Sequence, residues 1–136
     1  PVMTNVTATA SGGTYSYGVR NTSSSSPTMI NVTATASGGT TNYGVNNENA
    51  SNPAMTNVTV TASGGTADYG VYNYSSSPLI RRCTLSGDDH GLFTDKGTAT
   101  VSQSTIINGV GSVDGGTNKC VACDNGVGGA RNDNCL

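Results

Sequence analysis

Segments in which apolar and polar residues alternate recur along the chain at a nearly constant interval. Residues 5–13 read Asn-Val-Thr-Ala-Thr-Ala-Ser-Gly-Gly, and nearly the same phrase returns at residues 31–39 and again, after the same interval, at residues 57–65. Within each phrase Val or Ala takes every second position and Thr the positions between them. Alternation with a period of two predicts a β-strand with one buried face, and Ser-Gly-Gly predicts the turn that follows it.

The repeated unit is too small to bury its own apolar face. The first two units, residues 3–28 and 29–54, are identical at 17 of 26 positions without a gap. Stacking such units in register buries the face, because each strand then pairs with a strand above and a strand below. The sequence therefore predicts an all-β fold, a parallel β-solenoid (β-helix) of about five coils of 21–26 residues. We expect regular coils over residues 1–78, decayed coils over 79–119 and an irregular C-terminal cap over 120–136.

The stacking also predicts which residues point inward. Counting from the proline at the start of each unit, apolar residues persist at four positions even where the consensus decays. The expected columns are Met3, Met29, Met55, Ile80 and Val101; Val6, Val32, Val58, Cys83 and Ser104; Ala8, Ala34, Val60, Leu85 and Ile106; and Val19, Val45, Val71, Leu92 and Val121. At one corner we expect a ladder of stacked amides from Asn5, Asn31 and Asn57, which Arg82 and Gln103 interrupt.

Composition narrows the classes of function. Gly, Ser, Thr and Asn supply 70 of the 136 residues, whereas Leu, Ile, Val and Phe supply 22, so the interior must be narrow and filled by small side chains. No run approaches the roughly 18 apolar residues of a membrane span. The net charge of −2 leaves no basic surplus to neutralise phosphates, which argues against nucleic acid as a partner.

All four cysteines lie in the decayed coils and the C-terminal cap, and they favour an oxidising setting and hence a secreted, extracellular or cell-surface protein. Cys120 with Cys135 is the preferred disulfide, because it would pin the C-terminal tail against the last coil. Cys83 and Cys123 are left undecided. A zinc site built from Cys120 and Cys123, with His90 and one of the other cysteines, is the alternative, but a lone Cys-x-x-Cys is a weak signal. We expect no metal and no cofactor.

Residues 1–21 follow the pattern Pro-x-Met-x-Asn-Val-Thr-Ala-Thr-Ala-Ser-Gly-Gly-Thr-x-x-Tyr-Gly-Val-x-Asn. This pattern resembles the repeat of secreted bacterial right-handed parallel β-helix proteins, and residues 101–136 resemble the way in which such proteins end. The resemblance implies right-handed coils. It leaves the function open, because the same fold carries adhesins, phage fibres and polysaccharide-cleaving enzymes.

Asp88, Asp89 and His90 form the one cluster that suggests catalysis. β-Helix enzymes that cleave polysaccharides use paired aspartates and a histidine, one carboxylic acid protonating the leaving oxygen while others activate water. In those enzymes the residues come from different coils, whereas here they are adjacent in a shortened turn. His90 also takes the outward position of the repeated tyrosine. We therefore expect no active site and interpret the cluster as a solvated turn.

Two outward arrays are candidates for binding. Threonines at alternate positions predict flat ranks of the type used by ice-binding solenoids. We expect the ranks to end at the fourth coil, where only Thr84 and Ser86 follow. The ranks consist of Thr7, Thr9, Thr33, Thr35, Thr59 and Thr61. The second array is a strip of aromatic rings that could stack against sugars, and it consists of Tyr17, Tyr43 and Tyr69.

Six Asn-x-Ser/Thr sequons occur, and three of them are the corner asparagines of the repeat. The stacked corner amides would be poor acceptors of a glycan. Asn21, Asn49 and Asn73, in the predicted turns, are the better glycosylation candidates.

These patterns predict an extracellular structural or adhesive solenoid, a stiff rod that presents Thr, Asn and Tyr arrays. The chain opens on Pro1 in the middle of a repeat, so we expect the rest of a longer chain, or head-to-tail self-association into a filament, to cover its first coil. A protein that binds or cleaves polysaccharides is the alternative, with glycans as partners. Ice binding through the threonine ranks is a minor alternative.

Overall fold

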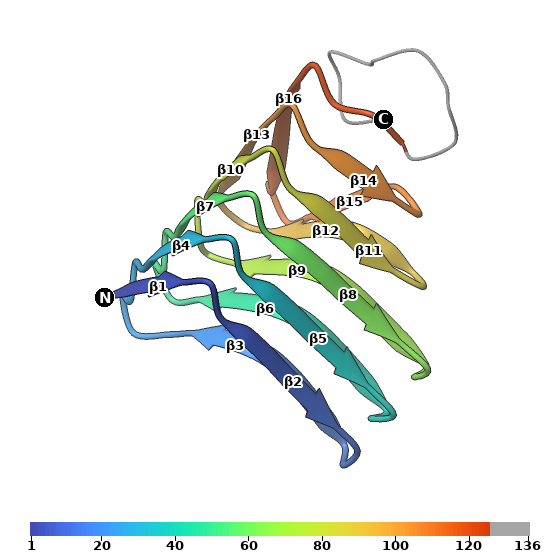
Figure 1. Ribbon diagram of the computed structural model, residues 1–136. Helices are drawn as coiled ribbons and strands as arrows, with labels where there is room; N and C mark the ends of the chain where they lie inside the picture. The colour runs from blue at the N-terminus through green and yellow to red at the C-terminus, as the bar shows by residue number, and fades with distance from the viewer. Residues whose placement is uncertain (126–136) are drawn as a thin grey trace.

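The computed structural model describes residues 1–125, which form sixteen β-strands and no helix (Figure 1). The strands make three sheets, called A, B and C here. Sheet A contains β1 (Val2–Thr4), β4 (Thr28–Ile30), β7 (Ala54–Thr56), β10 (Leu79–Arg81), β13 (Thr98–Ser102) and β16 (Thr117–Val121), in that order. Sheet B contains β2 (Thr7–Ser11), β5 (Thr33–Ser37), β8 (Thr59–Ser63), β11 (Thr84–Gly87) and β14 (Thr105–Ile107). Sheet C contains β3 (Tyr15–Asn21), β6 (Thr41–Glu48), β9 (Ala67–Tyr74), β12 (His90–Asp95) and β15 (Val110–Val113).

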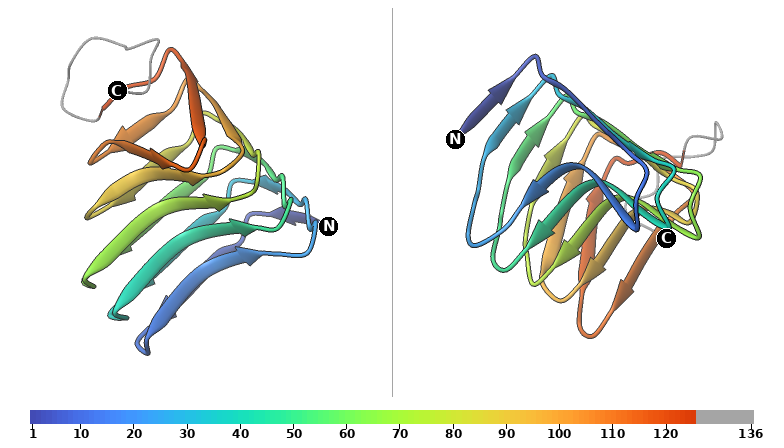
Figure 2. Two further views of the ribbon diagram at one scale, coloured as in Figure 1. Left: turned by 180° about the vertical axis from the view of Figure 1, so that it is seen from behind. Right: turned by 90° about the horizontal axis from the view of Figure 1, so that it is seen from below.

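The chain passes through sheets A, B and C in turn and then returns to sheet A, so that one strand from each sheet makes a coil. Every strand pairing is parallel, and equivalent residues of successive coils face each other in register. Figures 1 and 2 show the three sheets running side by side along one axis. The predicted all-β parallel solenoid is therefore confirmed for the described residues. Because these residues form no helix, nothing that the structure describes could cross a membrane as a helix.

The core fills the narrow space between the sheets, as the columns predict. In sheet A, Met29 and Met55 pair with each other and are almost completely buried, and Ile80 and Val101 continue the column. The apolar side chains that sheets B and C contribute are mostly Ala and Val. Small inward residues allow the sheets to approach closely, which is why so few large apolar residues suffice to fill the interior.

The prediction that Val121 ends the inward column of sheet C is wrong. Leu92 pairs with Val110, whereas Val121 lies opposite Ser102 in sheet A and is 62% exposed. The final coil is shorter than the regular repeat, since Val101 pairs with Cys120 across a shorter stretch of chain than the one that separates Met29 from Met55. The shortening makes Cys120 the inward residue, and its neighbour Val121 then points outward because side chains alternate along a strand. β16 also crosses the boundary predicted between the coils and the cap.

The corner between sheets A and B is a single residue in the left-handed conformation. Asn5, Asn31 and Asn57 each have a φ of 54°, a region that asparagine tolerates better than most residues. Arg82 and Gln103 have a φ of 50° at the same place, so the corner persists where asparagine is lost. The expected amide ladder is confirmed, because Asn31 Nδ2 donates to Asn5 Oδ1 at 3.1 Å and Asn57 Nδ2 to Asn31 Oδ1 at 3.3 Å.

The glycine of each Tyr-Gly-Val phrase lies where sheet C comes against sheet B. A Cβ placed on Gly44 would meet the Val60 side chain, the carbonyl oxygen of Gly70 at 2.8 Å and that of Thr61 at 3.1 Å. Glycine is therefore needed here for close approach of the two sheets.

Candidate functional site

The turn that contains Asp88 and Asp89 is held by its two carboxylates. That of Asp88 accepts a hydrogen bond from the backbone N–H of Gly64 at 3.2 Å, and that of Asp89 accepts one from the N–H of Asp68 at 2.6 Å. Both donors belong to the preceding coil. In the regular coils the N–H equivalent to that of Gly64 bonds to a backbone carbonyl of the next coil, as Gly38 does to Ser63. The carboxylate of Asp88 therefore replaces a backbone partner that the shortened turn no longer supplies.

A buried polar pair lies beside this turn. Asp68 is 1% exposed, and its carboxylate accepts hydrogen bonds from Asn42 Nδ2 at 2.6 Å and from the N–H of Gly65 at 2.9 Å. Asn42 closes its own turn in the same way, because its Oδ1 accepts from the N–H of Gly39. Sequence reasoning missed this pair. The signal was present, since Ser16, Asn42 and Asp68 occupy equivalent positions in three successive repeats.

The imidazole of His90 belongs to an aromatic row and not to the turn. It stacks on Tyr69 with ring centroids 6.0 Å apart and packs edge-on against Phe93 at 5.3 Å. Its Nδ1 is buried without a hydrogen-bond partner. Asp88 and Asp89 bind backbone N–H groups, whereas His90 packs among rings, so the structure does not bring the three side chains together around a substrate-sized space.

The predicted tyrosine strip lies on the outer face of sheet C, in register from coil to coil. The rings of Tyr17 and Tyr43 are 5.3 Å apart with planes 11° apart, and those of Tyr43 and Tyr69 are 5.7 Å apart with planes 15° apart. Such rings are stacked on one another, so neighbouring rings of the row cover their faces. A platform for sugar rings needs free faces, and this row does not offer them.

A second aromatic row runs beside the first. Tyr72 and Phe93 stack at 5.5 Å with planes 6° apart, and Tyr72 meets Tyr43 and Tyr69 edge to face. At the first coil the Arg20 guanidinium lies over the ring of Tyr17, 5.1 Å from its centroid. The rings therefore pack against one another, and these contacts join neighbouring coils.

We expect the aromatic rows to make the fold sensitive to alkali. Burial raises the pKa of Tyr17, Tyr43, Tyr69 and Tyr72 above the ordinary value of 10.0. A folded-state pKa above the unfolded one means that the fold favours the protonated phenol. The stability contributed is complete below the ordinary pKa and is lost as pH rises through the folded value. Urea unfolding should show a free energy of unfolding that falls from about pH 10 upward; a value that stays constant there would contradict the burial of these rings.

The threonine ranks lie on the outer face of sheet B, and the first rank is longer than predicted. Thr84 pairs with Thr59 and also with Thr105, so threonine occupies this position in every strand of the sheet. The second rank ends as predicted after Thr61, where Ser86 and Ile107 follow. The prediction that the ranks end at the fourth coil is therefore wrong for the first rank.

A second amide ladder, which sequence reasoning missed, runs inside the solenoid along sheet C. Asn21 Nδ2 donates to Asn47 Oδ1 at 2.9 Å, and Asn47 Nδ2 donates to Asn73 Oδ1 at 2.8 Å. Asn73 then donates to the Thr94 hydroxyl, which donates to Asn118. The signal was the recurrence of asparagine at one position of the repeat, two places after an inward valine.

This inner ladder corrects two of the three glycosylation candidates. Asn21 is 6% exposed and Asn73 is 0% exposed, and their amide nitrogens donate within the ladder. A glycan on either nitrogen would break the ladder and could not fit inside the coil. Asn49 is exposed in the turn after β6, so it stays a prediction.

The cysteines differ in state. Cys120 is in a disulfide, and its predicted partner Cys135 lies outside the described residues. Cys83 and Cys123 are free, buried thiols, and burial raises the pKa of both, which makes them poor nucleophiles near neutral pH. The Sγ of Cys83 accepts a hydrogen bond from the N–H of Val58. Within residues 1–125 no group of three or more His, Cys, Asp or Glu side chains is placed to hold a metal ion.

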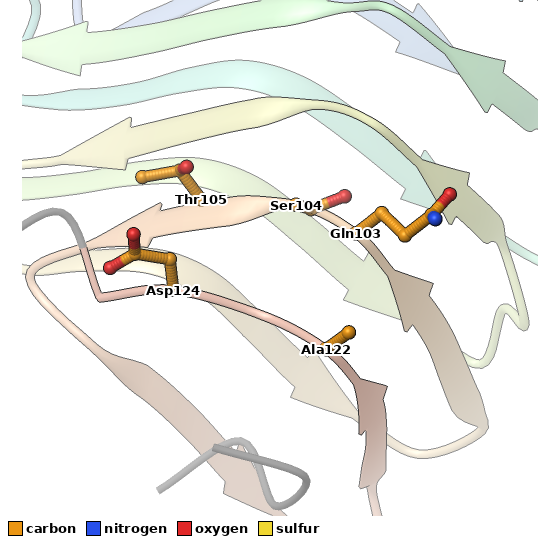
Figure 3. Close-up of a pocket in the computed structure, with 5 residues that line it drawn as sticks. All are labelled: Gln103, Ser104, Thr105, Ala122 and Asp124. Atoms are coloured by element: carbon orange, nitrogen blue, oxygen red, sulfur yellow. The ribbon is translucent and has the colours of Figure 1, made fainter. Parts of the chain in front are cut away.

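A small hollow lies outside the corner between β13 and β14 (Figure 3). It encloses about 180 Å³ and is lined by Gln103, Ser104, Thr105, Ala122 and Asp124. Pockets for small molecules usually enclose roughly 300–1,000 Å³ and have apolar walls. This hollow is smaller and mostly polar, so it does not resemble an active-site cleft.

The functional surfaces of the described residues are therefore arrays that repeat from coil to coil. Comparison of the chain with protein-family models, with curated proteins and with solved structures found no match.

Proposed function

We propose that the chain is a structural, adhesive β-solenoid, secreted or held at the cell surface, and that it has no catalytic activity. Its role is to be a stiff rod that presents repeated surfaces. The observation that supports this proposal is that side chains at several places around the solenoid hydrogen-bond to, or stack on, the equivalent side chains of the next coil. The corner amides, the inner amides and the aromatic rows each join one coil to the next in addition to the backbone pairing.

Two finer features belong to the same proposal. We take the coils to be right-handed and about five in number, which the resemblance to β-helix repeats supports. Connections between parallel strands of one sheet are also right-handed in nearly all proteins. The disulfide at Cys120 supports an oxidising, extracellular setting.

Polysaccharide cleavage is the competing proposal, and the geometry favours it less. General acid and base catalysis needs two carboxyl groups facing each other across the scissile bond. Here the carboxylates of Asp88 and Asp89 bind backbone N–H groups of the preceding coil.

Two substitutions of Asp89 separate a structural carboxylate from a catalytic one. Asp89→Asn keeps an oxygen that accepts from the N–H of Asp68, so we expect the free energy of unfolding to stay within about 0.5 kcal/mol. Asp89→Ala removes the acceptor and should lower it by about 1–2 kcal/mol. Urea unfolding measures both, and release of reducing ends from a panel of polysaccharides measures turnover. A wild-type chain that cleaves a polysaccharide, and loses this activity in Asp89→Asn, would refute the proposal.

A further inference from the structure

The outer face of sheet B carries a regular lattice of hydroxyl groups, called the threonine face here. One rank has a threonine in each of the five strands, and the second rank has threonine in three strands and serine in a fourth. Neighbouring strands lie about 4.8 Å apart, and alternate residues of one strand lie about 6.6 Å apart. The face is made of Thr7, Thr33, Thr59, Thr84 and Thr105 in the first rank, and Thr9, Thr35, Thr61 and Ser86 in the second.

These hydroxyls make no hydrogen bonds with the protein. In the part of the chain that the structure describes, the threonine hydroxyls that donate to protein groups are those of Thr66 and Thr94, and neither lies on sheet B. Each hydroxyl on the threonine face keeps a donor and two acceptor sites for an outside partner. The β-branched side chain restricts χ1, and the paired backbone fixes the spacing. The lattice is therefore ordered before any partner arrives, which lowers the entropy lost on binding.

The composition of the threonine face indicates a neutral partner. The five strands of sheet B contain no Asp, Glu, Lys, Arg or His and no aromatic residue, although Asp124 pairs with Thr105 and borders the end of the first rank. A nucleic acid or an anionic membrane would need basic groups, and a sugar would be expected to meet free ring faces or a cleft. Charge complementarity therefore favours an uncharged surface rich in both donors and acceptors.

The area of the threonine face argues against a second copy of the chain. Five strands of three to five residues cover at most roughly 24 Å by 17 Å, or about 400 Å². A stable protein interface buries about 800 Å² on each partner. A rigid solid needs no such area of shape complementarity, because it meets the lattice as a flat repeating surface.

We infer that the threonine face binds the surface of ice, through water molecules that the hydroxyl lattice holds in order. Ice is neutral, flat and rigid, and the water molecules at its surface offer both donors and acceptors to the lattice. The inference deepens the proposed adhesive function by naming what the rod adheres to. It rests on that proposal only in needing a folded solenoid, and the folding is tested separately by urea unfolding.

Thermal hysteresis, the gap between the melting and the freezing point of a solution, tests the inference on the oxidised full-length chain. We expect the wild-type chain to show hysteresis and to be taken up into slowly growing ice. Thr33→Tyr places a large ring at the centre of the first rank and should abolish both effects. The matched control is Thr28→Tyr, which places the same ring on the outer face of sheet A, where Thr28 is exposed, and should leave both unchanged.

Circular dichroism of both variants confirms that each remains folded, and Thr33→Val provides a second measurement if Thr33→Tyr does not fold. Valine keeps the methyl group and the strand propensity of threonine but replaces the hydroxyl with a second methyl group, so hysteresis should fall. A folded wild-type chain without hysteresis would overturn the inference and leave the structural rod intact. So would equal hysteresis in the Thr33 and Thr28 variants. Binding to crystalline cellulose or chitin in place of ice, lost in Thr33→Tyr, would overturn it in favour of a solid polysaccharide.

Discussion

Gly44→Ala is expected to lower the free energy of unfolding by about 3 kcal/mol, at the upper end of what overpacking usually costs. The new methyl group would overlap the fully buried Val60 side chain and would lie 2.8 Å from the carbonyl oxygen of Gly70. The oxygen belongs to β9, so it cannot move without disturbing the pairing of β9 with β6 in sheet C. Urea unfolding of the oxidised chain measures the loss.

The matched control is Gly109→Ala. Gly109 has a φ of +78°, but a Cβ placed there meets nothing within 4 Å. Alanine in the left-handed region should cost only about 1 kcal/mol. If the two substitutions destabilised the chain equally, the close approach of sheet C to sheet B at the Tyr-Gly-Val phrase would not exist in solution.

Asn47→Ala should also lower the free energy of unfolding by about 3 kcal/mol, because it leaves two buried partners without a bond. Asn21 Nδ2 loses its acceptor and Asn73 Oδ1 loses its donor, and the Asn47 side chain is completely buried. Both partners are buried, so bulk solvent does not replace the lost amide. The effect should be read from urea unfolding, with an unchanged circular dichroism spectrum showing that the native fold remains.

Asn31→Ala removes the same type of amide from the exposed corner ladder. Its neighbours Asn5 and Asn57 are exposed, so water replaces the lost bonds, and the remaining cost of about 1 kcal/mol comes from the left-handed backbone. Equal losses for Asn47→Ala and Asn31→Ala would show that the inner ladder is not sealed from solvent.

Periodicity predicted the fold well, because a solenoid makes the same local demands in every coil. The alternation of Val and Ala with Thr predicted sheet B, and the constant spacing of the repeats predicted that Met29 lies against Met55. Prediction failed at Val121, where the last coil shortens. The shorter final coil places Val110 opposite Leu92 in sheet C and leaves Val121 in sheet A, and neither hydropathy nor spacing shows where in a coil residues are lost.

The candidate site was harder to predict, because an inward polar residue looks like an outward one in the sequence. Asn21 and Asn73 were assigned to exposed turns, although each lies two residues after a buried valine in the same strand. Alternation places both residues on the same face, and buried amides are stable there only because each finds a partner in the next coil. The row of Tyr17, Tyr43 and Tyr69 was placed correctly, but only the structure shows that the rings cover one another's faces.

We expect these ladders to make the solenoid stiff. Bending or twisting the solenoid would separate neighbouring coils, and each coil is joined to the next by backbone bonds in three sheets and by stacked side chains. In such an array the stability is roughly a sum of the terms for single coils and for the contacts between neighbours. Removal of one complete coil should therefore shorten the rod without destroying it.

The most direct test of the account is deletion of residues 29–54. The cut joins Thr28 to Met55 and brings equivalent residues of the first and third units together, so that Met3 meets Met55, Tyr17 meets Tyr69 and Asn21 meets Asn73. We expect a cooperatively folded all-β protein, with a lower free energy of unfolding. Small-angle X-ray scattering should show a rod shorter by one strand spacing, about 4.8 Å. Deletion of residues 29–41, half of the repeat, is the matched control and should prevent folding, because it places every later strand in the wrong sheet. If the full-repeat deletion unfolded the chain as completely as the half-repeat deletion, the account of a solenoid built from stacked, in-register coils would be contradicted.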